Sequence, residues 1–295
     1  MKYNIQPFVK WVGGKRQLLK RIKARIPKNF DSYYEPFVGG GALFIELQNS
    51  KTVINDSSIE LTEAYITIRD NPIELMSLLD EHENNHQKSP SEYFYSMRAL
   101  DRQDDWEHKT TLEKTARFIY LNKSCFNGLY RVNKKGYYNT AFGKKDKINT
   151  YSRDNILILS AYLKSGQVKI INGDFENAVK TAKKGDFIFF DPPYDIIKKD
   201  TFDRYTKDGF GVEGQRRLSD VAHKLDKRGC YVMITNHNTP LINELYFDFN
   251  IDVVSVKRTI NSDASNRKGI EVIMYNYDLE ETRWPKKKPS PFVSA

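Results

Sequence analysis

The chain has 295 residues, enough for one large domain or two modest ones, and its 47 Lys and Arg against 38 Asp and Glu give a formal charge of +9. This charge is compatible with a polyanionic partner. Two cysteines, Cys125 and Cys230, are too few for a disulfide framework or a thiolate metal cluster. No run approaches the roughly 18 apolar residues of a membrane span, and the first residues lack an apolar segment, so we expect a cytoplasmic protein without a membrane anchor.

Strand-like runs lead into helix-like runs along much of the chain. The pairs are SYYEPF with GGGALFIELQN, KTVIND with SSIELTEAYITIRD, VKIINGDF with ENAVKTAKKG, DFIFFDPPY with EGQRRLSDVAHKLDKRG, and CYVMITNH with TPLINELYF. This alternation predicts an α/β fold with a largely parallel sheet and helices on its faces. Near the end, IDVVSVKRTI and GIEVIMYNYD predict an antiparallel hairpin with a long polar tip, NSDASNRK.

The alternation is interrupted between about Asn71 and Gly166. Polar helical patterns run from NPIELMSLLDEHENNH through SPSEYFYSMRALDRQ to TLEKTARFIYLNKSCF, and another helix is expected in SRDNILILSAYLKSG. The Gly/Asn/Lys-rich stretch NGLYRVNKKGYYNTAFGKKDK between them predicts an irregular basic loop. The simplest account is a helical insertion with this loop at its tip.

The glycines of EPFVGGG, residues 35–41, stand at an expected strand-to-helix junction. Glycines there let a ligand approach the N–H groups of a helix N-terminus, and a tight turn without a ligand is the alternative. The spacing differs from G-x-G-x-x-G, which disfavours a dehydrogenase. Asp56 ends the next strand, where an acid can accept hydrogen bonds from ribose hydroxyls or begin a helix with Ser57 and Ser58. The two elements together favour a nucleoside site.

The run FIFFDPPY places Asp191 directly after an apolar strand, where open α/β folds bind ligands. The two prolines fix φ and remove backbone donors, so their carbonyls remain as acceptors. Asp191 and the Pro192 carbonyl can each accept one N–H of an exocyclic amine, and Tyr194 can stack on a planar ring. A turn with an exposed aspartate is the alternative, but the motif is specific enough to favour an amine-binding site.

These motifs resemble those of the DNA adenine-N6 methyltransferases of the DNA adenine methylase (Dam) type. KWVGGKRQLL, FVGGG, NGLYRVNKKGYYNTAFGK and DPPY occur in the order of the alpha group of amino-methyltransferases, and the resemblance extends over residues 8 to about 277. It implies a Rossmann-like S-adenosylmethionine-dependent methyltransferase sheet with a C-terminal antiparallel hairpin and an inserted, mainly helical target-recognition domain. We expect a catalytic domain of residues 1–56 and 145–279, a recognition domain of residues 57–144, and a disordered basic tail of residues 280–295.

The resemblance implies methyl transfer from S-adenosyl-L-methionine to a flipped-out adenine in double-stranded DNA. A partnership with a cognate restriction endonuclease and action as an orphan enzyme both stay open. The catalytic positions that it matches are Asp191, Pro192, Pro193 and Tyr194. The cofactor-binding positions are Trp11, Lys15, Phe37, Gly39, Gly41, Asp56, Asp174 and Asp191. Among these, Asp56 corresponds to the ribose ligand, and Asp174 lies near the cofactor adenine.

The resemblance also implies a set of DNA contacts. Phe126, Asn127 and Leu129 match residues that enter or brace the duplex where the adenine is expelled. Arg131 matches an arginine that reads guanine, and Lys10 matches a lysine that reads the outer guanine. From the resemblance at these two positions alone, the expected recognition sequence is GATC. Arginine suits this role because its guanidinium can donate to guanine O6 and N7 together.

The chain departs from the family pattern after this region. The family's NVPFGRY is here NTAFGKK, so Asn139 is retained while Ala141 replaces a proline and Lys144 replaces an arginine that grips the backbone. Lysine keeps the charge toward a phosphate but loses the planar fork of donors. Asn139 and Lys144 remain expected DNA contacts.

Other functions are disfavoured to different degrees. A cytosine-C5 methyltransferase needs a nucleophilic cysteine, commonly after proline, whereas Cys125 follows Ser124 and Cys230 follows Gly229. An N4-cytosine methyltransferase would more typically carry Ser-Pro-Pro-Tyr. RNA or protein amine methyltransferases share the chemistry and stay open as alternatives, while a repressor would need no cofactor pocket. The histidines lack metal-ligand spacing, so we expect no metal.

Overall fold

The computed structural model describes residues 3–11, 13, 18–195, 210–257 and 268–279. Lys15, most of the tip of the expected hairpin and the tail of residues 280–295 lie outside these ranges. Among the described residues, no helix combines the length and the apolar content that a membrane span requires.

Within this described part, seven strands form a mixed sheet in the order β3-β2-β1-β4-β5-β7-β6. The strands are β1 (Tyr33–Glu35), β2 (Lys51–Asp56), β3 (Gln167–Asn172), β4 (Phe187–Phe190), β5 (Tyr231–His237), β6 (Asn250–Lys257) and β7 (Lys268–Tyr275). The pairs β1–β4, β2–β3 and β4–β5 are parallel, and β7 is antiparallel to both β5 and β6. The predicted α/β fold with a C-terminal antiparallel pair is confirmed.

The chain divides into two compact units, Met1–Arg16 with Glu35–Ala178, and Gln17–Tyr34 with Val179–Ala295. The domain boundaries expected from the sequence stay a prediction. Helices of the first unit are α2 (Ala42–Leu47), α3 (Ile59–Asp70), α4 (Pro72–Lys88), α5 (Pro90–Ala99), α6 (Thr111–Ser124), α7 (Arg153–Ser165) and α8 (Phe175–Ala178), with 3₁₀ turns η2 (Leu100–Arg102), η3 (Asp104–His108) and η4 (Phe126–Gly128). Helices of the second unit are α1 (Leu19–Lys23), α9 (Gly211–Lys227) and α10 (Pro240–Leu245).

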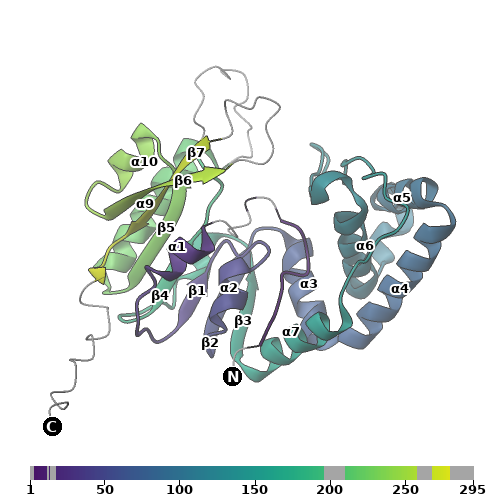
Figure 1. The fold of residues 1–295 in the computed structure, drawn as a ribbon, viewed down its shortest axis with the longest axis horizontal. Coiled ribbons are helices and arrows are strands. Elements are labelled where there is room, and N and C mark those ends of the chain that lie inside the picture. The colour runs from purple at the N-terminus through teal and green to yellow at the C-terminus, as the bar shows by residue number, and fades with distance from the viewer. Residues whose placement is uncertain (1–2, 12, 14–17, 196–209, 258–267, 280–295) are drawn as a thin grey trace, which may run out of the picture. The chain divides into compact units, whose positions relative to one another are not determined.

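Within the first unit, α4, α5 and α6 lie beside one another, away from β2 and β3 (Figure 1). Proline at the first position begins both α4 and α5, and a reciprocal capping box between Thr110 and Glu113 begins α6. Of these helices, α5 and α6 contribute to a separate apolar cluster around the fully buried rings of Phe94 and Tyr120. Local start signals and this cluster explain why the region folds as a helical body.

In the second unit, the four residues of β4 are all buried, and α9 packs on β5.

The helix expected in ENAVKTAKKG, which begins in the first unit, is shorter than predicted, since α8 ends at Ala178. Beyond that residue, the N–H groups of Ala182 and Asp186 bond to carbonyls three residues back, at 3.0 Å each, which forms turns in place of a continued α-helix.

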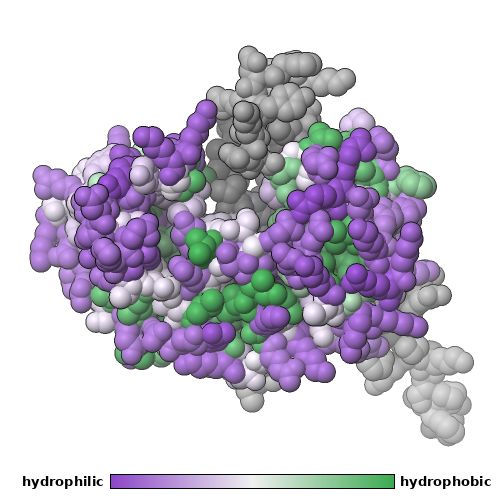
Figure 2. All heavy atoms as spheres, turned by 180° about the vertical axis from the view of Figure 1, so that it is seen from behind, coloured by the Kyte–Doolittle hydropathy of each residue, from purple (hydrophilic) through white to green (hydrophobic). Residues whose placement is uncertain are grey.

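Apolar side chains are mostly inside. On the face shown in Figure 2, hydrophilic residues cover most of the described surface, and apolar residues gather in smaller patches. Single exposed apolar residues such as Phe247, which is 81% exposed, are common on folded proteins. The surface pattern therefore assigns no function by itself.

Gly41 offers a test of local packing in the first unit. Its φ of 71° is left-handed, and a Cβ there would come within 2.5 Å of the Tyr65 hydroxyl oxygen. We expect Gly41→Ala to lower the free energy of unfolding by the left-handed strain of about 1–3 kcal/mol plus a steric term. Gly136 is the matched control, because its φ is 83° but no atom lies within 4 Å of an added Cβ. Equal losses for the two variants in urea unfolding would show that the Tyr65 contact is unimportant.

Candidate functional site

The loop of residues 36–41 joins β1 to α2 in the first unit. The Gly39 N–H donates to Asp56 Oδ2 at 3.0 Å, and the Val38 N–H donates to the Asn55 carbonyl at 2.9 Å. The end of β2 therefore fixes this loop. Two of the predicted cofactor residues, Gly39 and Asp56, are in direct contact.

The Asp56 carboxylate also organises the start of α3. Its Oδ1 accepts from the Ser58 N–H at 3.0 Å, and the Ser58 hydroxyl caps the helix by accepting from the Leu61 N–H. Burial raises the pKa of the Asp56 carboxyl, and the amides of Ser58 and Gly39 counteract part of that rise. A carboxylate has about four acceptor positions, so these amides leave capacity for a ribose hydroxyl. Asp56 can therefore help to begin α3 and still accept a hydrogen bond from a ribose hydroxyl.

Asn55, the residue before Asp56, joins this loop to a second one. Its side-chain amide donates to the Pro36 carbonyl at 2.9 Å and to the Gly173 carbonyl at 3.0 Å. The side chain is 1% exposed. The residues predicted from the sequence did not include Asn55, although a polar residue within an apolar strand was an available signal.

The second loop carries Asp174. The rings of Phe37 and Phe175 stack with centroids 5.3 Å apart and planes 28° apart, which brings Phe37 near the residue preceding Phe175. Asp174 Oδ1 accepts from the Glu176 N–H at 2.9 Å. The predicted residues Phe37, Gly39 and Asp174 therefore lie on two loops that Asn55 connects, and Asp56 is the next residue at the end of β2.

Trp11 lies against the first of these loops. A Cβ on Gly39 would come within 2.7 Å of Trp11 Cδ1, so the approach requires glycine. The Trp11 ring also stacks on Tyr130, with centroids 6.0 Å apart and planes 18° apart. The Tyr130 hydroxyl in turn donates to Glu60 Oε1 at 2.7 Å. The predicted partner of Trp11, Lys15, is outside the described residues.

The motif of residues 191–194 follows β4 in the second unit. Asp191 Oδ1 accepts from the Thr235 hydroxyl of β5 at 2.7 Å, which holds the carboxylate beside the end of its strand. The Pro193 carbonyl accepts from Gln215 Nε2 at 2.8 Å. Within the described residues, no hydrogen bond engages the Pro192 carbonyl. The expected acceptor pair, Asp191 and Pro192, is thus held in a fixed backbone.

A buried amide pair supports the chain after the motif. Asn236 Nδ2 donates to Gln215 Oε1 at 3.0 Å, and Asn236 Oδ1 accepts from the Asp195 N–H at 2.9 Å. Asn236 and Gln215 are 0% and 1% exposed. Gln215 was not predicted, because a glutamine in a charged amphipathic helix reads as a solvent-facing residue.

Tyr194 is held by a hydroxyl contact and a ring contact. Its hydroxyl donates to Glu271 Oε2 at 3.1 Å, and its ring meets the His237 ring edge to face, with centroids 4.9 Å apart. Burial, followed by the negative charges of Asp191 and Glu271, raises the pKa of the Tyr194 hydroxyl well above its usual value. The hydroxyl therefore stays protonated, and the orientation of the ring is fixed.

A buried side chain connects Lys10 to the helical region. Asn122 of α6 accepts the Lys10 N–H on Oδ1 and donates from Nδ2 to the Lys10 carbonyl, both at 2.8 Å. Nδ2 also donates to the Gly128 carbonyl at 3.2 Å. Lys10 thus lies beside the turn that contains Phe126 and Asn127, with its own side chain exposed.

That turn presents an aromatic ring to solvent. Phe126 is 55% exposed, and Asn127 adopts a left-handed φ of 55°. The Phe126 N–H donates to the Ala141 carbonyl at 2.9 Å, and the Leu129 carbonyl accepts from the Thr140 hydroxyl at 2.7 Å. The stretch expected to be irregular is therefore partly ordered by pairing across its base.

Residues 129–140, below called the 129–140 hairpin, turn back on themselves. An antiparallel bridge pairs Val132 with Tyr138, and the Asn139 N–H donates to the Arg131 carbonyl at 2.9 Å. Arg131 Nε donates to Asn139 Oδ1 at 2.8 Å. The structure brings these two predicted DNA contacts together and leaves Arg131 exposed.

Lys144 is the last of the predicted DNA contacts along the chain. Lys144 is exposed and has a left-handed φ of 52°. Among the described residues, no three His, Cys, Asp or Glu side chains gather as a metal site would require. The absence of a metal stays a prediction.

Comparison with known proteins identifies the family. The sequence matches the model of the D12 class N6 adenine-specific DNA methyltransferase family over residues 11–260.

The type II methyltransferase M1.LlaDCHI of Lactococcus lactis subsp. cremoris is 42% identical over 278 residues, covering 94% of this chain and 97% of that protein. The type II methyltransferase M.MjaIII of Methanocaldococcus jannaschii is 38% identical over 295 residues, covering 93% and 100%. The DNA adenine methylase of Escherichia coli is 29% identical over 278 residues, covering 94% and 96%. The chain therefore belongs to the D12 class of N6 adenine-specific DNA methyltransferases.

Proposed function

We propose that this chain transfers a methyl group from S-adenosylmethionine to the N6 amine of an adenine flipped out of duplex DNA, within the sequence GATC. The observation that carries this proposal is the Asp191 carboxylate, which follows a fully buried strand and is held by Thr235 at 2.7 Å beside the Pro192 carbonyl. Two adjacent acceptors in a fixed backbone suit an amine that has two N–H donors.

The two loops of the first unit fit an adenosine-containing cofactor. The half-buried Asp56 carboxylate retains acceptor capacity for ribose hydroxyls, and the Phe37–Phe175 pair offers an apolar aromatic surface near Asp174. Phe37, Gly39, Gly41, Asp56 and Asp174, with Trp11, would hold the cofactor, and Lys15 is proposed from the resemblance alone. When bound, S-adenosylmethionine supplies an electrophilic methyl group that an amine nitrogen can accept directly.

The residues of the second unit would position the adenine. Asp191 accepts one N–H of the exocyclic amine, and the Pro192 carbonyl accepts the other, which keeps the nitrogen lone pair available. Tyr194, with its ring fixed by Glu271 and His237, supplies a stacking surface for the base. This arrangement accelerates the reaction by orientation, and it requires neither a covalent enzyme intermediate nor a metal.

The exposed residues of the first unit would bind the DNA. Phe126, Asn127 and Leu129 lie at the turn that would occupy the space left by the flipped adenine. The GATC assignment depends on Lys10 and Arg131, which match guanine-reading residues. Asn139 and Lys144 would contact the DNA beside them. A formal charge of +9 is consistent with a polyanionic substrate.

Two further points extend the proposal beyond the family assignment. We propose a restriction endonuclease as a partner of this enzyme, and the name type II methyltransferase that two relatives carry supports this proposal. A cytoplasmic location, where the chain would meet its DNA, is proposed on the same basis.

Asp191→Ala tests the catalytic assignment. We expect this variant to lose methyl transfer to duplex DNA while its DNA affinity stays within about tenfold, because phosphate contacts supply most of that affinity. Asp248→Ala is a matched control, since Asp248 is an exposed carboxylate of the same unit that pairs only with His223 in the described residues. Full methyl transfer by Asp191→Ala would refute the role of the motif.

Arg131→Ala tests the reading of guanine. Loss of a bidentate arginine–guanine contact should reduce discrimination at one base pair by about 1–3 kcal/mol and leave the other positions unchanged. Relative methylation rates on duplexes with single substitutions would measure this. An unchanged preference at every position would show that a different residue reads the base.

A further inference from the structure

The direction of Arg131 depends on residues 138–140, below called the return strand of the 129–140 hairpin. Its guanidinium donates to Asn139, which lies between Tyr138 and Thr140 on that strand. The turn itself is ordered by Asn133, whose Oδ1 accepts the N–H groups of Lys135 and Tyr137 at 2.9 and 3.1 Å. A displacement of the return strand would therefore move the side chain that orients Arg131.

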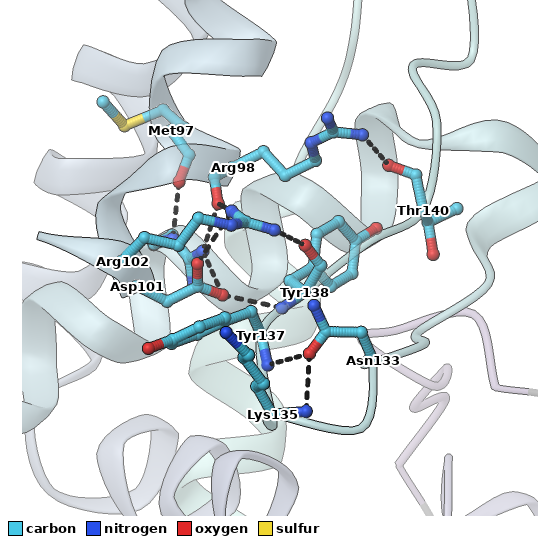
Figure 3. Close-up of polar contacts among 10 residues, drawn as sticks. Met97, Arg98, Asp101, Arg102, Asn133, Lys135, Tyr137, Tyr138 and Thr140 are labelled. Atoms are coloured by element: carbon cyan, nitrogen blue, oxygen red, sulfur yellow. Dashed lines mark hydrogen bonds and ion pairs between the residues drawn. The ribbon is translucent and has the colours of Figure 1, made fainter.

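Side chains from another segment hold this return strand. Asp101 Oδ2 accepts the Tyr138 N–H at 2.7 Å, and Arg102 Nη2 donates to the Tyr138 carbonyl at 2.7 Å, as Figure 3 shows. Arg98 Nη1 donates to the Thr140 carbonyl at 3.3 Å. Both backbone groups of Tyr138 are thus bonded to side chains of η2, in the way that a neighbouring strand would bond them.

Asp101 is itself fixed by two arginines. Arg117 Nη2 lies 3.0 Å from Asp101 Oδ2, and Arg102 Nη1 lies 3.0 Å from Oδ1. Arg117 donates to the Met97 carbonyl at 2.6 Å and to the Arg98 carbonyl at 3.1 Å, so it also holds the end of α5. The side chains of Arg117 and Asp101 are only 9% and 10% exposed. A buried ion pair with further hydrogen bonds has one well-defined geometry, which suits a positioning role.

We propose that Asp101, held by Arg102 and Arg117, is a positioning residue for sequence discrimination. It fixes the Tyr138 amide, and through Asn139 it fixes the direction of Arg131. Asp101 touches no DNA in this account. The inference rests on the proposed function, since it assumes that Arg131 reads a base.

The test compares four variants on a DNA library that holds every single-base variant of the motif methylated by the wild-type enzyme. The variants are Asp101→Ala, Arg131→Ala, the double variant, and Asp70→Ala. The methylated adenines are mapped at single-nucleotide resolution. Asp70 is the control, because it is a carboxylate of the same unit that is paired with Arg69 on the surface and is 45% exposed. It reports the effect on DNA binding of losing one negative charge.

We expect Asp101→Ala to lose about tenfold or more of the discrimination at the base pair that Arg131 reads. The double variant should lose no more than Arg131→Ala, because residues that act through one contact are not additive. Asp70→Ala should discriminate like the wild type. A role in stability alone would lower the amount of active enzyme but would leave the ratio between sites unchanged.

Removal of Asp101 leaves the buried Arg117 without its counter-charge, so this variant is assayed below its melting temperature. Arg102→Ala provides a second test. Arg102 is 34% exposed and donates to the same residue, Tyr138, so the same loss of discrimination is expected. Wild-type discrimination in folded Asp101→Ala or Arg102→Ala, or full additivity with Arg131→Ala, would overturn the inference. A wild-type enzyme that methylates no defined adenine motif would overturn the proposed function and the inference together.

Discussion

The proposed cofactor-binding loops of the first unit depend on two consecutive residues at the end of β2. Asn55 bonds the carbonyls of Pro36 and Gly173, and Asp56 bonds the amides of Gly39 and Ser58. Two loops and the start of α3 are therefore tied to the end of one partly buried strand. Because a strand inside a sheet has little freedom, the loops inherit its position, and a cofactor would meet groups that are already oriented.

The second unit uses the same principle for its carboxylate. Buried β4 sets the position of Asp191, Thr235 of the neighbouring strand holds one of its oxygens, and the Gln215–Asn236 pair fixes the backbone that follows. Each hydrogen bond restricts the conformations that residues 191–194 can adopt. Methyl transfer to an amine needs alignment more than it needs acid–base chemistry, so rigidity is the property that the proposed site would require.

Much of this arrangement could be predicted from the sequence because its signals are local. The strand that ends at Asp56 and the strand that ends just before Asp191 are short runs bounded by turn residues, and the C-terminal antiparallel pair showed the same pattern. Asn55, Gln215 and Asp101 were missed. Each acts on a partner that is distant in sequence, such as the Gly173 carbonyl for Asn55 and the Tyr138 amide for Asp101. Their spacing alone resembles that of ordinary polar residues, and only the folded chain shows what they bond.

The central claim is that the Asp-Pro-Pro-Tyr motif acts on adenine in duplex DNA. The most direct measurement is to incubate the wild-type chain with duplex plasmid and methyl-labelled S-adenosylmethionine, and then to map each labelled base at single-nucleotide resolution. The account predicts N6-methyladenine within one short motif, with GATC as the expected sequence. Label on cytosine N4 of the plasmid, or no label on the plasmid at all, would contradict it. Label on RNA or protein, in parallel reactions where these replace the DNA, would contradict it as well.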